Sequence, residues 1–221
     1  MVLDPDGMTD LPPGKIATVV TFLELLRRPD RPPAPDRGWA LDPIGDDVER
    51  YRALFRRIGE PWLWFSRLVM PEPELLAILA DRDVEAFVLR ADGTDIGLLE
   101  LDFRRPGECE LAFLGVVPEA IGSGAGRFLI GQAVARAFAR PIRRLFVHTC
   151  TLDHPSALAF YRRAGFRPYR RAVEIADDPR LKGYVPLAAA PHMPPLPERE
   201  AARSRLRSAL PGWAGRRGRN E

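Results

Sequence analysis

The residues best suited to chemistry lie in a glycine-rich segment, Ile121-Gly122-Ser123-Gly124-Ala125-Gly126, which is followed by Arg127. Glycines let a backbone approach a ligand closely and adopt angles closed to other residues. N–H groups at the start of a helix point outward without partners, and the helix dipole adds positive potential there. Such a turn is often only structural, but it can also form an anion site shaped for a diphosphate.

The surroundings of this segment narrow the choice of ligand. A P-loop would need lysine after the last glycine, and Arg127 stands there instead. A dinucleotide-binding fold would need an acidic residue about 20 positions on, but no Asp or Glu occurs between Glu119 and Asp153. That stretch holds Arg127, Arg136, Arg140, Arg143 and Arg144. An acid-free, arginine-bearing stretch suits a ligand with several phosphates, such as coenzyme A.

A second block follows downstream and runs Ala157-Leu158-Ala159-Phe160-Tyr161-Arg162-Arg163-Ala164-Gly165-Phe166. Together with Val116-Val117-Pro118 and the glycine segment, it closely resembles the GNAT acyltransferase superfamily. Members carry Val-x-Pro, then a Gln/Arg-x-x-Gly-x-Gly/Ala loop, then a helix containing Ala-x-x-Phe-Tyr-x-x-x-Gly-Phe. The resemblance covers residues 16 to about 175, and in the first half it rests on the order of strands alone.

The chain departs from the family pattern at two positions. Ile121 stands where Gln or Arg usually opens the loop. The main-chain donors of residues 123–126 do not depend on that side chain, so cofactor binding is expected to survive. His154, with Asp153 beside it, replaces the usual Asn before the second helix.

The resemblance implies an N-acetyltransferase that uses acetyl-CoA or another short acyl-CoA as acyl donor. The backbone of Val116 and Val117 would pair with the pantetheine arm like an added strand. Tyr161 would protonate the leaving thiolate, since the ordinary pKa of a phenol lies above that of a thiol. Without the resemblance, Tyr161 reads as a packed aromatic. The implied cofactor-binding residues are Val116, Val117, Ile121, Gly122, Ser123, Gly124, Ala125, Gly126, Arg127, His154 and Tyr161.

Attack by an amine on a thioester needs a neutral amine, so some group must accept a proton. Glu110 has the spacing of the strand-borne glutamate that serves as base in the histone acetyltransferase branch. It would share a face with Ala112 and Leu114 if no bulge intervenes. His148 on the following strand is the rival base, and a water is the third choice. Cys150 lacks any local sign of activation as a nucleophile.

Three more carboxylates lie near Glu110 along the chain. Glu100, Asp102 and Glu108 could form with it an acidic wall that attracts a cationic amine. They could equally line a solvated sheet edge. Nearby residues 60–65 carry Trp62, Trp64 and Phe65, which could contact the acceptor or fill the core.

The apolar pattern predicts the elements that position these groups. Strands are expected over residues 16–26, 84–91, 95–103, 108–117, 144–151 and 166–175, and helices over 46–58, 71–81, 127–139 and 155–164. Residues 29–43 are dense in proline and are expected to be a loop. Leu75, Leu76 and Leu79 are expected to face inward. This order predicts an α+β (mixed α/β) fold with a central mixed, mostly antiparallel twisted sheet and helices on both faces.

Length and composition set the wider bounds. The length fits one domain with ragged ends, an acyltransferase domain over 15–187. Residues 1–14 and the proline- and arginine-rich tail 188–221 are expected to lack fixed structure, although 198–210 could form a short helix. The two cysteines make neither a disulfide framework nor a zinc site, so no metal is expected. The start lacks a secretory signal and no apolar stretch is long enough to span a bilayer, which favours the cytoplasm.

Three functions are compatible with these features. The first is direct transfer of an acetyl or other short acyl group from acyl-CoA to a primary amine of a small molecule, peptide or protein. The second is a catalytically silent domain that senses acyl-CoA. The third is association with nucleic acid through the arginine tail, which the small net charge of +3 disfavours. No membrane partner is expected, and a homodimer stays open.

Overall fold

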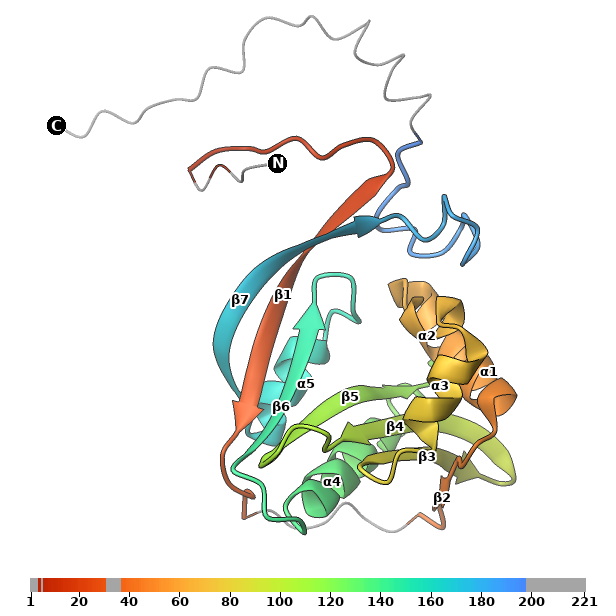
Figure 1. Cartoon of the computed structure of the whole chain (residues 1–221), viewed down its shortest axis with the longest axis vertical. Helices are drawn as coiled ribbons and strands as arrows, with labels where there is room; N and C mark the ends of the chain where they lie inside the picture. Colours follow the sequence, from red (N-terminus) through yellow and green to blue (C-terminus); the bar gives the residue numbers. More distant parts are fainter. Residues whose placement is uncertain (1–3, 5, 31–36, 198–221) are drawn as a thin grey trace, which may run out of the picture.

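A computed structural model describes residues 4, 6–30 and 37–197. Within them, seven strands form one sheet in the order β2-β3-β4-β5-β6-β1-β7, and every neighbouring pair is antiparallel except β5 and β6 (Figure 1). The strands are β1 (Lys15–Leu25), β2 (Ala40–Pro43), β3 (Val84–Ala91), β4 (Thr94–Asp102), β5 (Glu108–Val116), β6 (Arg144–Cys150) and β7 (Arg167–Asp177). The helices are α1 (Val48–Gly59), α2 (Ser66–Val69), α3 (Glu72–Leu79), α4 (Ala125–Ala137) and α5 (Ala157–Ala164), with short 3-10 turns at η1 (Glu60–Trp62) and η2 (Pro118–Ala120).

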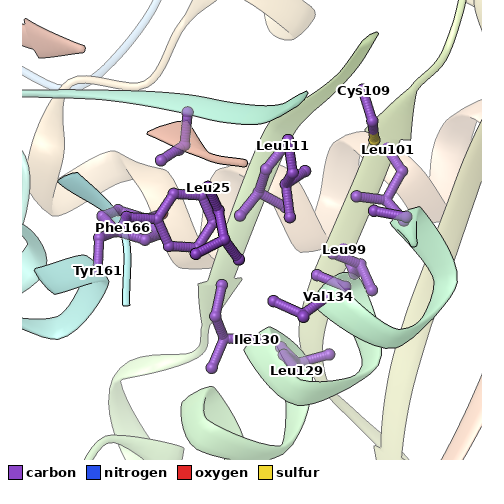
Figure 2. Close-up of a cluster of buried hydrophobic side chains, with 14 of the residues drawn as sticks. Leu25, Leu99, Leu101, Cys109, Leu111, Leu129, Ile130, Val134, Tyr161 and Phe166 are labelled. Atoms are coloured by element: carbon purple, nitrogen blue, oxygen red, sulfur yellow. The ribbon is translucent and has the colours of Figure 1, made fainter. Parts of the chain in front are cut away.

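Helices cover both faces of the sheet, which confirms the expected fold class. On one face, α4 and α5 pack on a core that Figure 2 shows around Leu99, Leu111 and Val134. On the other face, α1 and α3 bury Tyr51 and Phe55 against β3 and β4. Along β3 and β4, odd-numbered residues such as Leu89 and Leu99 face the first layer and even-numbered residues such as Val88 face the second, as alternation along a strand requires.

The first strand of the chain lies inside the sheet. β1 pairs antiparallel with β6 on one side and with β7 on the other, and these three strands run together away from β3–β5 (Figure 1). The segments that flank β1 and β7 also meet, because the Asp178 N–H donates to the Gly14 carbonyl across 2.9 Å. The Gly14 N–H in turn donates to the Leu196 carbonyl across 3.2 Å.

β5 and β6 are paired over a short distance only. Their parallel ladder joins Glu108, Cys109 and Glu110 to Arg144, Leu145 and Phe146. Beyond it, β5 continues along β4 to Val116 while β6 continues along β1 to Cys150. In the described part of the chain, the β6-side edge of β5 is therefore unpaired after Glu110.

A bulge changes the faces of β5 beyond Glu110. Leu101 pairs with Leu111 but Glu100 pairs with Phe113, so Ala112 is an extra residue in β5. Phe113 consequently faces the α1 side, while Leu114 packs against the α4 side. The condition under which Glu110 would share a face with Ala112 and Leu114 is therefore not met, because the bulge puts Leu114 on the opposite face from Glu110.

Two local expectations are also corrected. Residues 40–43, expected as loop, form β2 against β3. Pro43 is tolerated there because an edge strand needs no ladder bond from its outer N–H groups. Leu76 is 40% exposed, whereas Leu75 and Leu79 are buried, since residues four apart share a helix face and Leu76 lies around the axis from them.

The C-terminal segment of the described residues packs on the domain. Ala189 and Ala190 are buried with Ile16, Leu63 and Leu152. The buried guanidinium of Arg180 is held by Asp178 and donates to the carbonyls of Ala189 at 3.0 Å and Met193 at 2.6 Å. Residues 198–221, with the alternative helix over 198–210, lie outside the described residues, and the domain bounds stay a prediction. No helix of the described chain is both long and apolar enough to cross a bilayer.

Candidate active site

The glycine segment joins β5 to α4 through η2, as expected. Gly122 and Gly124 have φ angles of 84° and 96°, and Gly124 is the N-cap of α4. Residues that carry a β-carbon rarely adopt such φ angles, so both positions favour glycine. The Ser123 hydroxyl braces the turn by donating to the Ala120 carbonyl at 2.7 Å and accepting the Ala125 N–H at 3.2 Å.

Several main-chain donors of this turn remain available. Within the described residues, the N–H groups of Gly122, Gly124, Gly126 and Arg127 donate to no other atom, and the first helical N–H with a backbone acceptor is that of Phe128. Two of the four N–H groups expected to bind the cofactor are already used: that of Ser123 donates to the Ala120 carbonyl, and that of Ala125 donates to the Ser123 hydroxyl. The open donors cluster at the positive end of a 13-residue helix.

Aromatic side chains flank the turn on both sides. A β-carbon at Gly124 would lie 3.9 Å from Trp39, and one at Gly126 would lie 3.6 Å from Phe160 of α5. Ile121 is half-exposed and Arg127 is exposed on the first turn of α4. The donors thus sit between two rings, within reach of a ligand that arrives from solvent.

Val116 and Val117, the two valines expected to bind the pantetheine arm, differ in whether their backbone groups are available for hydrogen bonds. The Val117 N–H donates to Ile96 at 3.0 Å, and its carbonyl accepts the Ala120 N–H at 2.9 Å, so both backbone groups are engaged. Val116 pairs with Gly97 of β4 in the next rung. Because backbone groups alternate between the two sides of a strand, those of Val116 point toward the unpaired edge.

Tyr161 of α5 is a core residue in this structure. Its ring packs against Phe160 and Phe166, at 5.3 and 5.8 Å between ring centroids, and Figure 2 shows Tyr161 next to Phe166 in the buried cluster. Burial raises the pKa of the phenol, and the charge of Asp153 raises it further. Tyr161 therefore stays protonated at neutral pH and keeps a proton to donate.

The structure brings together the two rival bases. The Nδ1 atom of His148 lies 3.5 Å from Oε1 of Glu110, with the His148 side chain half-exposed and that of Glu110 about a quarter exposed. The Glu110 carboxylate raises the pKa of His148 above its usual value, against the opposing effect of burial. Glu110 is the last residue of the β5–β6 ladder, so the pair lies where the strands diverge.

A pocket adjoins this pair and is lined by Asp102, Arg104, Arg105 and Glu110. The Arg104 guanidinium holds Asp102 in a forked contact, with Nε 3.0 Å and Nη2 2.5 Å from Oδ2. Burial opposes ionisation of Asp102, but the hydrogen bonds from Arg104 outweigh it and lower the pKa of that carboxyl. Asp102 therefore lines the pocket as a carboxylate that is paired with Arg104.

The expected acidic wall is wrong. Glu100 is fully buried beneath α1 and α2, where it accepts the Tyr51 hydroxyl and lies 2.5 Å from the Arg67 guanidinium. A buried carboxylate requires such partners, because its desolvation is otherwise costly. Glu108 pairs with Arg144 at 3.0 Å. Only Asp102 and Glu110 of the four acids face the pocket.

The aromatic residues after α1 meet the turn that follows β6. The Trp64 ring packs on Phe55 and Phe113, and its indole N–H donates to Oδ1 of Asp153 at 3.0 Å. The other oxygen of Asp153 accepts the Thr149 hydroxyl at 2.7 Å and the Cys150 N–H at 2.9 Å. The contact between Asp153 and Trp64 could not be predicted from the sequence, because the two residues lie 89 positions apart and no local pattern marks it.

His154 and Cys150, which lie on either side of Asp153 in the chain, are also held by local contacts. The His154 ring lies 5.0 Å from that of Trp62, and its Nδ1 accepts the Ser156 N–H at 3.1 Å. Burial raises the pKa of the Cys150 thiol, so it remains a thiol rather than a nucleophilic thiolate. His154 therefore lies beside Trp62 on the turn after β6, and Cys150 is a structural residue at the end of that strand.

Comparison with known proteins identifies the family and supports the fold. The model of the acetyltransferase (GNAT) family matches residues 50–166, just over half of the chain. A GCN5-related N-acetyltransferase from Sphaerobacter thermophilus is similar with a TM-score of 0.54 and 16% identity over 73% of this chain, which spans 52% of that protein. A putative GNAT acetyltransferase from Novosphingobium aromaticivorans has a TM-score of 0.51 and 22% identity over 75% of this chain and 67% of its own. Comparison with curated proteins gives no match.

Those structural likenesses show the fold, and the family match adds acyl transfer as the general chemistry. The match contains the glycine segment, the β5–β6 divergence and α5, whereas β1 and β7 lie outside it. The chain belongs to the acetyltransferase (GNAT) family.

Proposed function

We propose that the chain is an N-acyltransferase that moves an acetyl or other short acyl group from acyl-CoA directly to a primary amine. The observation that carries the proposal is the set of open N–H groups at Gly122, Gly124 and Gly126, placed next to the unpaired edge of β5. The open N–H groups could donate hydrogen bonds to a diphosphate. The unpaired edge of β5 could form strand-like hydrogen bonds with an arm that contains amides. Acyl-CoA contains both parts in one molecule.

The residues of the chain fit such a donor. Main-chain N–H groups at the start of α4 would bind the diphosphate, with Trp39 and Phe160 on either side. The backbone of Val116 would hydrogen-bond the pantetheine arm along the open edge of β5. The thioester would then lie where β5 and β6 diverge, near Tyr161 and the Glu110–His148 pair.

Transfer would proceed in one step at the thioester carbon. The neutral amine nitrogen forms the new C–N bond while the C–S bond breaks. The Glu110–His148 pair accepts the proton that the amine loses, directly or through water. The Tyr161 phenol gives its proton to the leaving sulfur and recovers one from solvent. The products are the amide and free coenzyme A.

A silent acyl-CoA sensor is the second candidate, and the deep burial of Tyr161 favours it. Thiol release from acetyl-CoA across a panel of amino acids, polyamines, aminoglycosides and peptides separates the two. We expect amine-dependent thiol release, with an equal amount of acetylated amine found by mass spectrometry. Tight binding of acetyl-CoA with no release for any amine would establish the sensor, and absence of binding would overturn both.

A further inference from the structure

The charged residues that line the pocket beside the Glu110–His148 pair indicate which class of acceptor could bind there. We propose that the acceptor is an amine that also bears an anionic group such as a carboxylate, with Glu110 receiving the ammonium end and Arg105 the anion. The inference rests on the proposed function and adds a substrate class to it. The inference follows from three features: the position of the pocket, the charged groups in it that are already paired, and the end of the β5–β6 divergence that is closed to an acceptor.

The pocket opens at the point of divergence. Glu110, one of its four lining residues, is the last rung of the β5–β6 ladder and contacts His148. An ammonium held at Glu110 would give up its proton to this pair. Its nitrogen would then attack the thioester carbon, forming C–N as C–S breaks. The Glu110 carboxylate would thus both bind the acceptor ammonium and take part in removing its proton.

Two of the four pocket charges neutralise each other. The Asp102 carboxylate and the Arg104 guanidinium face one another in the forked contact, which uses both carboxylate oxygens. Such a bidentate pair is geometrically specific and leaves little net charge for a ligand. What remains to meet an acceptor is the carboxylate of Glu110 and the guanidinium of Arg105.

Arg105 is placed to bind an anion. It is exposed, and within the described residues its side chain forms no ion pair. The guanidinium lies 5.4 Å from the ring centroid of Phe146, a buried residue of β6. That cation–π contact orients the group without occupying its N–H donors. A flat fork of free donors is the arrangement that suits a carboxylate.

The opposite end of the divergence is closed by the chain itself. The Trp64–Asp153 hydrogen bond crosses it, and Val185, Ala189 and Ala190 pack beyond it against Leu63 and Leu152. An acceptor would therefore approach from the Glu110 side. A dication arriving there would be repelled by Arg105, whereas a zwitterion would place its ammonium at the Glu110–His148 pair and its anion at Arg105.

Matched acceptors test the inference. Phenylalanine and β-alanine are each compared with their primary amides, which keep the amine and the size but lose the anion. The amides have less basic amines, so intrinsic reactivity favours them and any preference for the acids must come from the site. We expect kcat/KM to favour each acid by about tenfold or more, a size typical of a hydrogen-bonded charge. In Arg105→Gln, the acid-to-amide ratio should fall toward one.

Two further variants complete the experiment. Arg143→Gln removes an exposed arginine from the neighbouring turn, outside the pocket lining, and should leave the acid-to-amide ratio unchanged. Arg105→Glu should invert the ratio. Equal use of acids and amides by the unmodified protein, or the same ratio in Arg105→Gln, would overturn the inference and leave the acyltransferase standing. No thiol release with either form, while another amine of the wider panel is acetylated, would overturn the inference alone, and no release with any amine would overturn the proposed function as well.

Discussion

The indole N–H of Trp64 donates to Asp153 across 3.0 Å and so joins the two sides of the β5–β6 divergence. Trp64 lies on the β5 side, where its ring packs on Phe113. Asp153 belongs to the turn after β6 and also accepts from Thr149 and the Cys150 backbone. The hydrogen bond therefore fixes the separation of the strands at the closed end of the site.

Loss of this bond should affect both stability and substrate binding. Trp64→Phe keeps an aromatic ring beside Phe55 and Phe113 but removes the N–H donor together with part of the indole, leaving one oxygen of Asp153 without its partner. We expect the free energy of unfolding to fall by about 1 kcal/mol and the KM of the acceptor to rise more than kcat falls. Trp62→Phe is the control, since the Trp62 contacts with His154 and His192 are ring contacts. Identical melting curves and KM values for the two variants would show that the bond is incidental.

Removal of the Tyr161 hydroxyl should slow the chemical step. Burial keeps this phenol protonated, so it can donate to the leaving sulfur at any physiological pH. Tyr161→Phe retains the packing with Phe160 and Phe166 and should lower kcat by about 100-fold, with acetyl-CoA affinity nearly unchanged. Single-turnover kinetics at saturating acceptor measure this directly. An unchanged chemical rate would assign Tyr161 to the core alone.

The Glu110–His148 pair predicts a particular pH dependence. Glu110 raises the pKa of His148, so Glu110→Gln should return that pKa toward the ordinary value of about 6.5, as followed by NMR of the imidazole protons. A raised pKa in the folded state stabilises the protein below the unfolded value and loses this effect as pH rises through the folded value. The stability difference between the two proteins should thus be largest near pH 6 and shrink at higher pH.

Activity of the same variants separates the roles of the two residues. Turnover of Glu110→Gln should fall most at low pH and recover as pH rises, because free amine becomes available without help. A structural His148 would make His148→Gln lose activity at every pH. A flat profile for Glu110→Gln beside a recovering profile for His148→Gln would transfer the role of base to His148.

The C-terminal segment divides into a part that packs and a part expected to be dispensable. Truncation after Ala188 removes the carbonyls of Ala189 and Met193 that accept from the buried Arg180 guanidinium. It should cost about 1–3 kcal/mol of unfolding free energy, measured by denaturant titration. Truncation after Pro197 removes only the arginine-rich remainder and should change neither stability nor turnover. Equal stability of the two truncated proteins would contradict this division.

Local patterns in the sequence predicted much of the fold. The strands that became β3 to β6 and the helix α4 lie within two residues of their expected bounds, because alternation and helical spacing were clear there. The glycine segment and Tyr161 also lie on the expected elements. Their position depends on short-range signals that one stretch of chain carries by itself.

Features that depend on distant partners could not be predicted in this way. The bulge at Ala112 arises from the register of β5 against β4, and it turns Phe113 instead of Leu114 toward the α1 side of the sheet. Glu100 reads as a solvated strand residue until Arg67 and Tyr51 are seen to enclose it. A role for Arg105 in binding the acceptor likewise could not be predicted until the structure placed it in one pocket with Glu110.

The central claim is that the start of α4 binds acyl-CoA, and one calorimetric comparison tests it. Gly126→Glu places a carboxylate among the open N–H groups, where its β-carbon has ordinary contact room beside Phe160. Gly131→Glu adds the same charge at an exposed position with open space on the same helix. A carboxylate near a helix N-terminus does not destabilise the helix, so folding should survive in both. We expect acetyl-CoA to bind Gly126→Glu at least about 100-fold more weakly, or roughly 2.7 kcal/mol, while Gly131→Glu keeps the affinity of the unmodified protein. Unchanged affinity in Gly126→Glu would contradict the account.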